Sequence, residues 1–63
     1  MNTLYDVQQL LKKHGTIIYT RDTQLDLELM EEEIRELHNW KMVETSVFLQ
    51  ALLIIQKEKH GHM

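Results

Sequence analysis

The sequence predicts an all-α fold, a three-helix bundle. Apolar residues recur at helical spacing in three segments, each segment follows a residue that can cap a helix, and the chain contains no proline. The expected helices span about residues 4–14, 24–39 and 45–59. Together they form a single domain, residues 1–63, with a frayed tail that begins at about residue 60.

The first helix has a start signal and a stop signal. Thr3 and Asp6 have the spacing of a capping box, with aspartate in place of the usual glutamate. Gly15 can adopt the left-handed conformation that ends a helix. Between these signals, one arc of the helix carries the apolar residues Leu4, Val7, Leu10 and Leu11.

The second helix is acidic on the face opposite its apolar residues. Thr23 and Asp26 repeat the capping spacing, and from Asp22 to Glu36 there are seven acidic residues against one arginine. We expect an ion pair between Glu31 and Arg35, four residues apart, and a solvated face otherwise. The apolar side consists of Leu27, Met30, Ile34 and Leu37.

A metal site is not expected on this acidic helix. Glu28 and Glu32 have a spacing that suits a divalent ion, but no second set of ligands accompanies them. The sequence therefore predicts no metal and no cofactor.

The third helix is apolar around most of its circumference. Thr45 or Ser46 offers its cap, and one broad face comprises Val47, Phe48, Ala51, Leu52, Ile54 and Ile55. Leu49 and Leu53 lie outside that face as a second ridge. Such a wide arc predicts a central helix that touches both others; the alternative is a contact with a second copy or another protein.

Residues 12–22, KKHGTIIYTRD, connect the first two helices. Ile17, Ile18 and Tyr19 favour extended backbone, but no second strand signal is present to pair with them. We expect an extended linker in which Ile17 or Ile18 plugs the end of the bundle. The alternative is that this segment adds to the strand edge of a partner.

Composition points to a soluble cytoplasmic protein. The absence of cysteine excludes disulfides and thiolate zinc sites, and no secretory signal is recognisable. The longest apolar run, Ala51 to Ile55, is too short to cross a bilayer. A chain of 63 residues has a small core, so an oligomer or a partner is plausible.

Catalysis has no support in the sequence, whereas binding has some. There is no cysteine nucleophile, no glycine-rich phosphate loop and no serine, histidine and acid arrangement on a recognisable scaffold. In an up-down-up bundle, however, the end of the first helix, the start of the second and the end of the third share one pole. That pole would gather Lys12, Lys13, Arg21, Lys57 and Lys59.

Two tyrosines extend this basic pole. Tyr5 projects away from the apolar arc onto the side of Gln9 and Lys12, and Tyr19 offers a second aromatic platform. Bases of a single strand stack on such rings while phosphates meet cations. Both features also have a structural explanation, because lysines near helix C-termini complement the helix dipole and tyrosines often cover a core edge.

We therefore expect a non-enzymatic binding module for single-stranded RNA or DNA. The candidate nucleic-acid-binding residues are Tyr5, Gln9, Lys12, Lys13, Tyr19, Arg21, Lys57 and Lys59. The alternative is protein interaction or self-association through Trp40, Met42, Leu49 and Leu53.

Four segments resemble a known family. They are YDVQQLLKKHG, IIYTRD, DLELMEEEIRELH and FLQALLIIQKEK. In this order they closely resemble the YqgQ-like family, small bacterial proteins without an assigned cellular role. The resemblance implies a three-helix bundle with a proposed capacity for single-stranded nucleic acid, carried here by Tyr5, Lys12, Tyr19 and the basic end of the third helix.

One departure from the family concerns the end of the connecting segment. Family members often continue Ile-Tyr-Thr with Gly-Asp-Arg, whereas this chain reads Arg21-Asp22-Thr23. The cation therefore stands two positions earlier, and the glycine that would ease a positive φ is missing.

Overall fold

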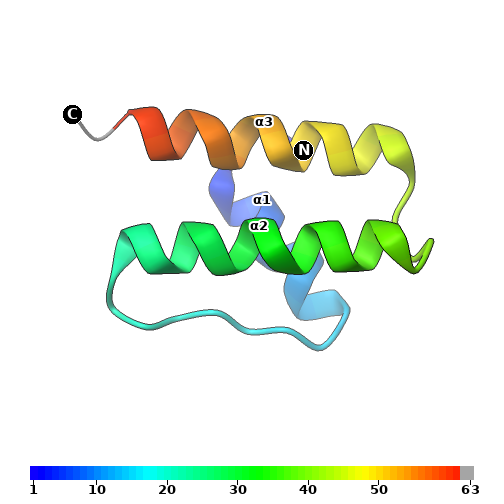
Figure 1. Ribbon diagram of the computed structural model, residues 1–63, viewed down its shortest axis with the longest axis horizontal. Coiled ribbons are helices and arrows are strands. Elements are labelled where there is room, and N and C mark those ends of the chain that lie inside the picture. Colours follow the sequence, from blue (N-terminus) through cyan, green and yellow to red (C-terminus); the bar gives the residue numbers. More distant parts are fainter. Residues whose placement is uncertain (62–63) are drawn as a thin grey trace.

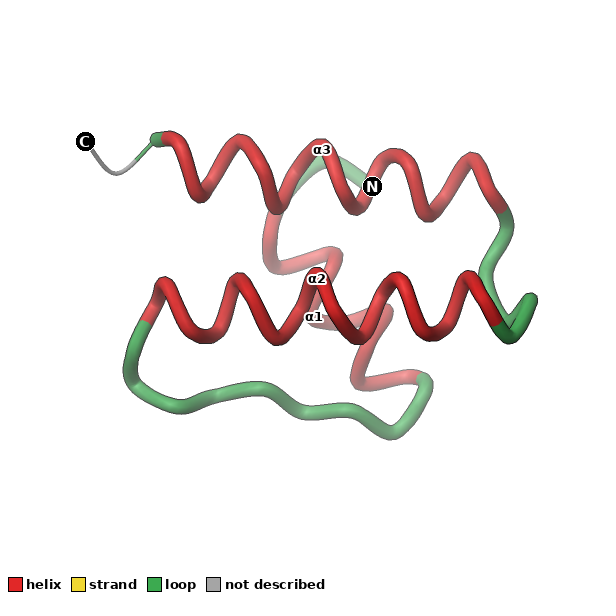
Figure 2. The backbone as a smooth tube through the Cα atoms, viewed as in Figure 1, coloured by secondary structure: helices red, strands yellow, loops and turns green. Residues whose placement is uncertain are grey.

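The computed structural model describes residues 1–61 as three helices and no strand (Figure 1, Figure 2). The helices are α1 (Leu4–Lys13), α2 (Thr23–Asn39) and α3 (Thr45–His60). The all-α, three-helix prediction is thus confirmed, with helix ends within one residue of those expected. His60, expected in a frayed tail, is still helical, and His62 and Met63 lie outside the described residues.

The helices α2 and α3 run antiparallel, and α1 crosses them steeply (Figure 1). All three helices contribute to one apolar core, and α2 provides the largest share. The fully or almost fully buried side chains are Val7 and Leu11 from α1, Leu27, Met30, Ile34 and Leu37 from α2, and Ala51 and Ile55 from α3. Within residues 1–61, every helix is too short or too polar to span a membrane.

The start and the stop of α1 are those expected. The Asp6 N–H donates to Thr3 Oγ1 at 3.4 Å, and the Thr3 N–H donates to Asp6 Oδ2 at 3.2 Å, which completes the capping box. Hydrogen bonds from the Asn2 and Thr3 backbone lower the pKa of Asp6. Gly15 follows the helix with φ +88°, the left-handed conformation.

The predicted caps are wrong by one residue for α2 and, for Thr45 or Ser46, by one or two residues for α3. Asp22, not Thr23, caps α2 by accepting a hydrogen bond from the Leu25 N–H at 3.3 Å. Glu44 is the N-cap residue of α3 and makes no side-chain capping bond, while Thr45 already lies inside the helix.

Thr45 is held by a contact across the α2–α3 turn. Its Oγ1 lies 3.2 Å from His38 Nε2, and the His38 ring stacks on Phe48 with 4.1 Å between centroids. His38, at the end of α2, therefore fixes the first turn of α3.

Residues 14–22, here called the connector, run back along α2 (Figure 1), and between the turn at residues 14–15 and the left-handed Arg21 they follow a stretched path. Thr16 Oγ1 donates to Glu33 Oε1 at 3.0 Å, and near the other end Thr20 Oγ1 donates to Asp26 Oδ1 at 2.7 Å. Ile18 packs against the core, as expected, although from the flank of α2 rather than beyond the helix ends. Ile17 does not pack against the core, because the residue is 78% exposed.

The second apolar ridge of α3 faces solvent. Leu49 is 52% exposed and Leu53 is 71% exposed. Although α3 contacts both other helices, those contacts do not reach this ridge. The expectation that a central position explains the whole apolar arc is therefore wrong for these two leucines.

Candidate nucleic-acid interface

A hollow of about 240 Å³ lies between α1 and the connector. The nearly inaccessible Leu11 and Met30 form its floor, together with the partly buried Ile18. Its rim carries polar and aromatic groups from Gln8, Gln9, Lys12 and Tyr19. None of the described residues that line it is acidic, although Glu33 accepts a hydrogen bond from the lining residue Thr16.

Helix α1 carries three of the predicted nucleic-acid-binding residues in one row, of which Gln9 and Lys12 line the hollow and Tyr5 does not. Tyr5, Gln9 and Lys12 are separated by four and three residues, which places them on one side of a helix. All three are exposed, and Tyr5 has 65% of its surface accessible. Lys13 follows in the last turn, where a cation also complements the helix dipole.

The connector positions Tyr19 through its extended backbone. Successive side chains of an extended segment point to opposite sides, so Ile18 faces the core while Ile17 and Tyr19 face outward. Asp26 holds the next residue, Thr20, by accepting from both its N–H at 2.8 Å and its hydroxyl at 2.7 Å. Tyr19 is 74% exposed, and the next residue along the chain is held in place by Asp26.

Arg21, near the end of the connector, adopts a left-handed conformation. Its φ is 68°, which is unusual for a residue with a side chain, and it directly precedes the cap residue Asp22. The arginine is exposed. Its backbone therefore adopts a conformation that glycine would adopt more easily.

The predicted single basic pole does not form. The Thr16 contact with Glu33 places the end of α1 about ten residues into α2, roughly 15 Å from its start at a rise of 1.5 Å per residue. Lys12 and Lys13 are therefore separated from the end at which α2 starts and α3 ends (Figure 1). The up-down-up prediction failed here because a long connector lets α1 cross the other helices instead of aligning with them.

The end of α3 lies beside the start of α1. Leu4 from α1 and Ile54 from α3 line one surface depression together with Lys57. Lys57 thus neighbours the beginning of α1, and not its end as the basic pole required.

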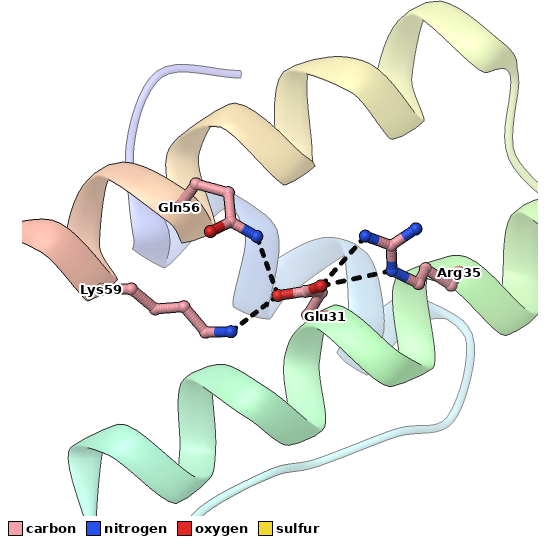
Figure 3. Close-up of polar contacts among 4 residues, drawn as sticks. All are labelled: Glu31, Arg35, Gln56 and Lys59. Carbon is pink, nitrogen blue, oxygen red and sulfur yellow. Dashed lines mark hydrogen bonds and ion pairs between the residues drawn. The ribbon is translucent and has the colours of Figure 1, made fainter.

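Lys59 is engaged in an internal ion pair. Its Nζ lies 2.8 Å from Glu31 Oε1, which also accepts from Gln56 Nε2 at 2.9 Å (Figure 3). Arg35 Nη2 reaches the other carboxylate oxygen at 3.0 Å, so the expected Glu31–Arg35 pair is confirmed. Hydrogen bonds from Lys59 first, and then from Arg35, lower the pKa of Glu31.

The candidate protein-interface residues are all exposed, but they occupy two places. Trp40 and Met42, which are 74% and 57% exposed, lie in the turn between α2 and α3. Leu49 and Leu53 lie on consecutive turns of α3.

Sequence reasoning missed the groups that hold the connector in place. Thr16 and Thr20 bind Glu33 and Asp26, which are 17 and 6 residues away. No short motif encodes such pairs. The sequence shows the threonines and the acidic residues of α2. Which threonine meets which carboxylate depends on how the connector lies along α2, and only the tertiary structure shows this.

Comparison with known proteins identifies a family. The model of the family described as YqgQ-like matches residues 1–61. A protein of Bacillus subtilis (strain 168), described as "Uncharacterized protein YqgQ", is 45% identical over 58 residues, which cover 92% of this chain and 82% of that protein.

Proposed function

We propose that this chain, which belongs to the YqgQ-like family, is a non-enzymatic cytoplasmic module that binds single-stranded nucleic acid through the hollow between α1 and the connector. One observation carries the proposal. The protein has a net charge of −3, yet this hollow has a lysine, two amides and a tyrosine on its rim and no acid in its lining.

The chemistry of the rim suits an unpaired nucleotide. A base can stack on the exposed Tyr19 ring, while Gln8 and Gln9 offer hydrogen-bond donors and acceptors to its edge. Lys12 supplies a cation for the adjoining phosphate. A small hollow with an apolar floor accepts one ring, and bases stacked inside a duplex cannot enter it.

The small number of cations near the hollow limits its affinity for nucleic acid. Lys12 is the cation among the described residues that line the hollow, and Lys13 and Arg21 lie outside that lining. For single strands the logarithm of the binding constant falls with the logarithm of salt by about 0.7 per phosphate contact. We therefore expect weak binding with a shallow but measurable salt dependence.

Fluorescence anisotropy with labelled single-stranded RNA and DNA at two salt concentrations tests the proposal. Lys12→Glu should weaken binding and reduce the salt slope. Lys41→Glu is the matched control, because it makes the same charge change in the α2–α3 turn, outside the hollow. The proposal fails if no salt-dependent binding is seen at high protein concentration, or if both variants weaken binding equally.

A second pair of variants tests the aromatic contact. Tyr19→Ala should lose roughly tenfold in affinity, since base stacking is worth about 1–3 kcal/mol per base. Tyr19→Phe should retain most of it, because the ring remains. Equal losses from both variants would show that the hydroxyl, and not stacking, matters.

A further inference from the structure

Tyr5 lies on the surface of α1 and belongs neither to the core nor to the hollow. It is 65% exposed, whereas Leu4, the residue before it, packs against the buried cluster. The described residues that line the hollow between α1 and the connector do not include it. A tyrosine that only covers a core edge buries its ring and keeps its hydroxyl in water. Because most of Tyr5 is in water, its ring is open to a ligand.

Helix geometry places Tyr5 beside the rim of the hollow. Gln8 and Gln9 follow it by three and four residues, and side chains at these spacings are neighbours on a helix surface. Both amides line the hollow. Lys12 also lines it and follows Tyr5 by seven residues, which is about two turns along the same side of α1. Tyr5 therefore continues the lined surface toward the start of α1.

The acid next to Tyr5 is bound to the backbone before the helix. Asp6 Oδ2 accepts a hydrogen bond from the Asn2 N–H at 2.9 Å and from the Thr3 N–H at 3.2 Å. Adjacent residues of a helix also point about 100° apart, so Asp6 does not share the side of Tyr5 and Lys12. A phosphate between Tyr5 and Lys12 thus meets the lysine rather than this carboxylate.

The distance along α1 sets the length of the ligand. The seven residues from Tyr5 to Lys12 span about 10 Å at a rise of 1.5 Å per residue. Neighbouring stacked nucleotides of one strand are about 3.4 Å apart, so this span corresponds to about three nucleotide steps. A single nucleotide beside Lys12 leaves Tyr5 unused, whereas a short strand covers both.

We propose that the ligand is a single strand of about four nucleotides that follows α1, with one base in the hollow against Tyr19 and a base near the other end stacked on Tyr5. The inference rests on the proposed function of the hollow, and it adds a second stacking position and a minimum length. The phosphates between the two bases lie along Gln9 and Lys12. Stacking on an exposed ring is tolerant of sequence, so length rather than base identity is the property selected.

Nuclear magnetic resonance titrations with oligouridylates and oligodeoxythymidylates of one to eight nucleotides test the length. Affinity should rise about tenfold between one and four nucleotides, as one added base stack provides, and then rise only slightly. Tyr5→Ala should remove most of this rise and leave the binding of one nucleotide unchanged. A constant affinity from one to four nucleotides would overturn the inference.

Two further variants show whether the aromatic ring at this position is responsible. Trp40→Ala is the matched control, because it removes another exposed aromatic side chain, in the α2–α3 turn and away from the hollow. It should leave the length dependence unchanged. Tyr5→Phe should keep it, because the ring remains. Equal effects of Tyr5→Ala and Trp40→Ala would contradict a stacking position on α1.

A fluorescent base tests the order of the two rings along the strand. 2-Aminopurine loses fluorescence when it stacks, and it is placed in turn at each position of a four-nucleotide strand. Quenching near one end should be lost in Tyr19→Ala and kept in Tyr5→Ala, and quenching near the other end should show the reverse. Loss of quenching at the same position in both variants would overturn the two separate stacking positions.

The outcomes also separate this inference from the proposed function of the hollow. If Lys12→Glu weakens binding but Tyr5→Ala leaves the length dependence intact, the hollow binds nucleic acid and the second stacking position is wrong. If strands of every length fail to bind, both proposals are wrong.

Discussion

Helix α2 uses its carboxylates differently on the two sides that face its neighbours. Toward α3, Glu31 accepts hydrogen bonds from charged groups of Lys59 and Arg35 and from the amide of Gln56 (Figure 3). Toward the connector, Asp26 and Glu33 accept from threonine hydroxyls. Three acidic residues of α2 thus bind other parts of the chain, so the acidic side of α2 is not only a solvated face as predicted.

The difference in donors teaches what each contact can do. An ion pair is weakened by salt and by acid, whereas a bond from a neutral hydroxyl responds less to salt. The α3 contact therefore depends on solution conditions. The hydrogen bonds of Asp26 and Glu33 instead hold the connector in place. Tyr19 of the connector lines the hollow, and none of the described lining residues is acidic.

The largest expected loss of stability comes from truncating a core side chain, and it tests whether α1 packs against the core as firmly as α3 does. Leu11 on α1 is 1% exposed and Ile55 on α3 is 0% exposed. Leu11→Ala and Ile55→Ala should each lower the free energy of unfolding by about 2–5 kcal/mol. Urea titration followed by circular dichroism measures both; a near-zero cost for Leu11→Ala would mean that α1 is a loosely attached arm.

Next in size is the removal of the charged contact to α3. Glu31→Gln should lower the free energy of unfolding by about 1 kcal/mol at low salt, a value kept small because the group is partly exposed to solvent. The cost should shrink in high salt. Glu28→Gln is the matched control, since it makes the same change at an exposed position of α2.

The same variant gives a pH dependence of known sign. Because the folded-state pKa of Glu31 lies below the usual 4.5, its stabilisation is fully present above that pH and is lost as pH falls through the folded value. The original chain should therefore lose more stability than Glu31→Gln on acidification below about pH 4.5. Parallel curves for the two proteins would contradict the ion pair.

A smaller effect is expected on the connector side. Thr20→Val keeps the shape of the side chain but removes the hydroxyl that binds Asp26, and should lower the free energy of unfolding by about 0.5–1 kcal/mol. Unlike that of Glu31→Gln, this cost should persist in high salt. Thermal unfolding of both variants at two salt concentrations measures the two stability losses. If the loss from Thr20→Val vanished in high salt, the proposed difference between the two contacts would be wrong.

The smallest effect should be a gain. Arg21→Gly relieves the left-handed backbone at φ 68° but adds freedom to the unfolded chain, so the net gain should be about 0.5 kcal/mol or less. A loss of stability measured in urea would mean that the Arg21 side chain contributes a stabilising contact.

The sequence by itself determined the parts that depend on neighbours within a few residues. Apolar spacing located the three helices, and Thr3, Asp6 and Gly15 marked the limits of α1. The i,i+4 pair of Glu31 and Arg35 belongs to the same class. Such contacts form within one helix, so periodicity and local geometry suffice to predict them.

Only the tertiary structure decided how those helices cross and which charges meet. It replaced the single basic pole with a hollow on one flank, paired Lys59 with Glu31 across 28 residues, and left Leu49 and Leu53 exposed. The physical reason is that the long connector permits several paths for α1. The path adopted depends on the joint packing of Ile18 and the hydrogen bonds of Thr16 and Thr20, which no local pattern encodes.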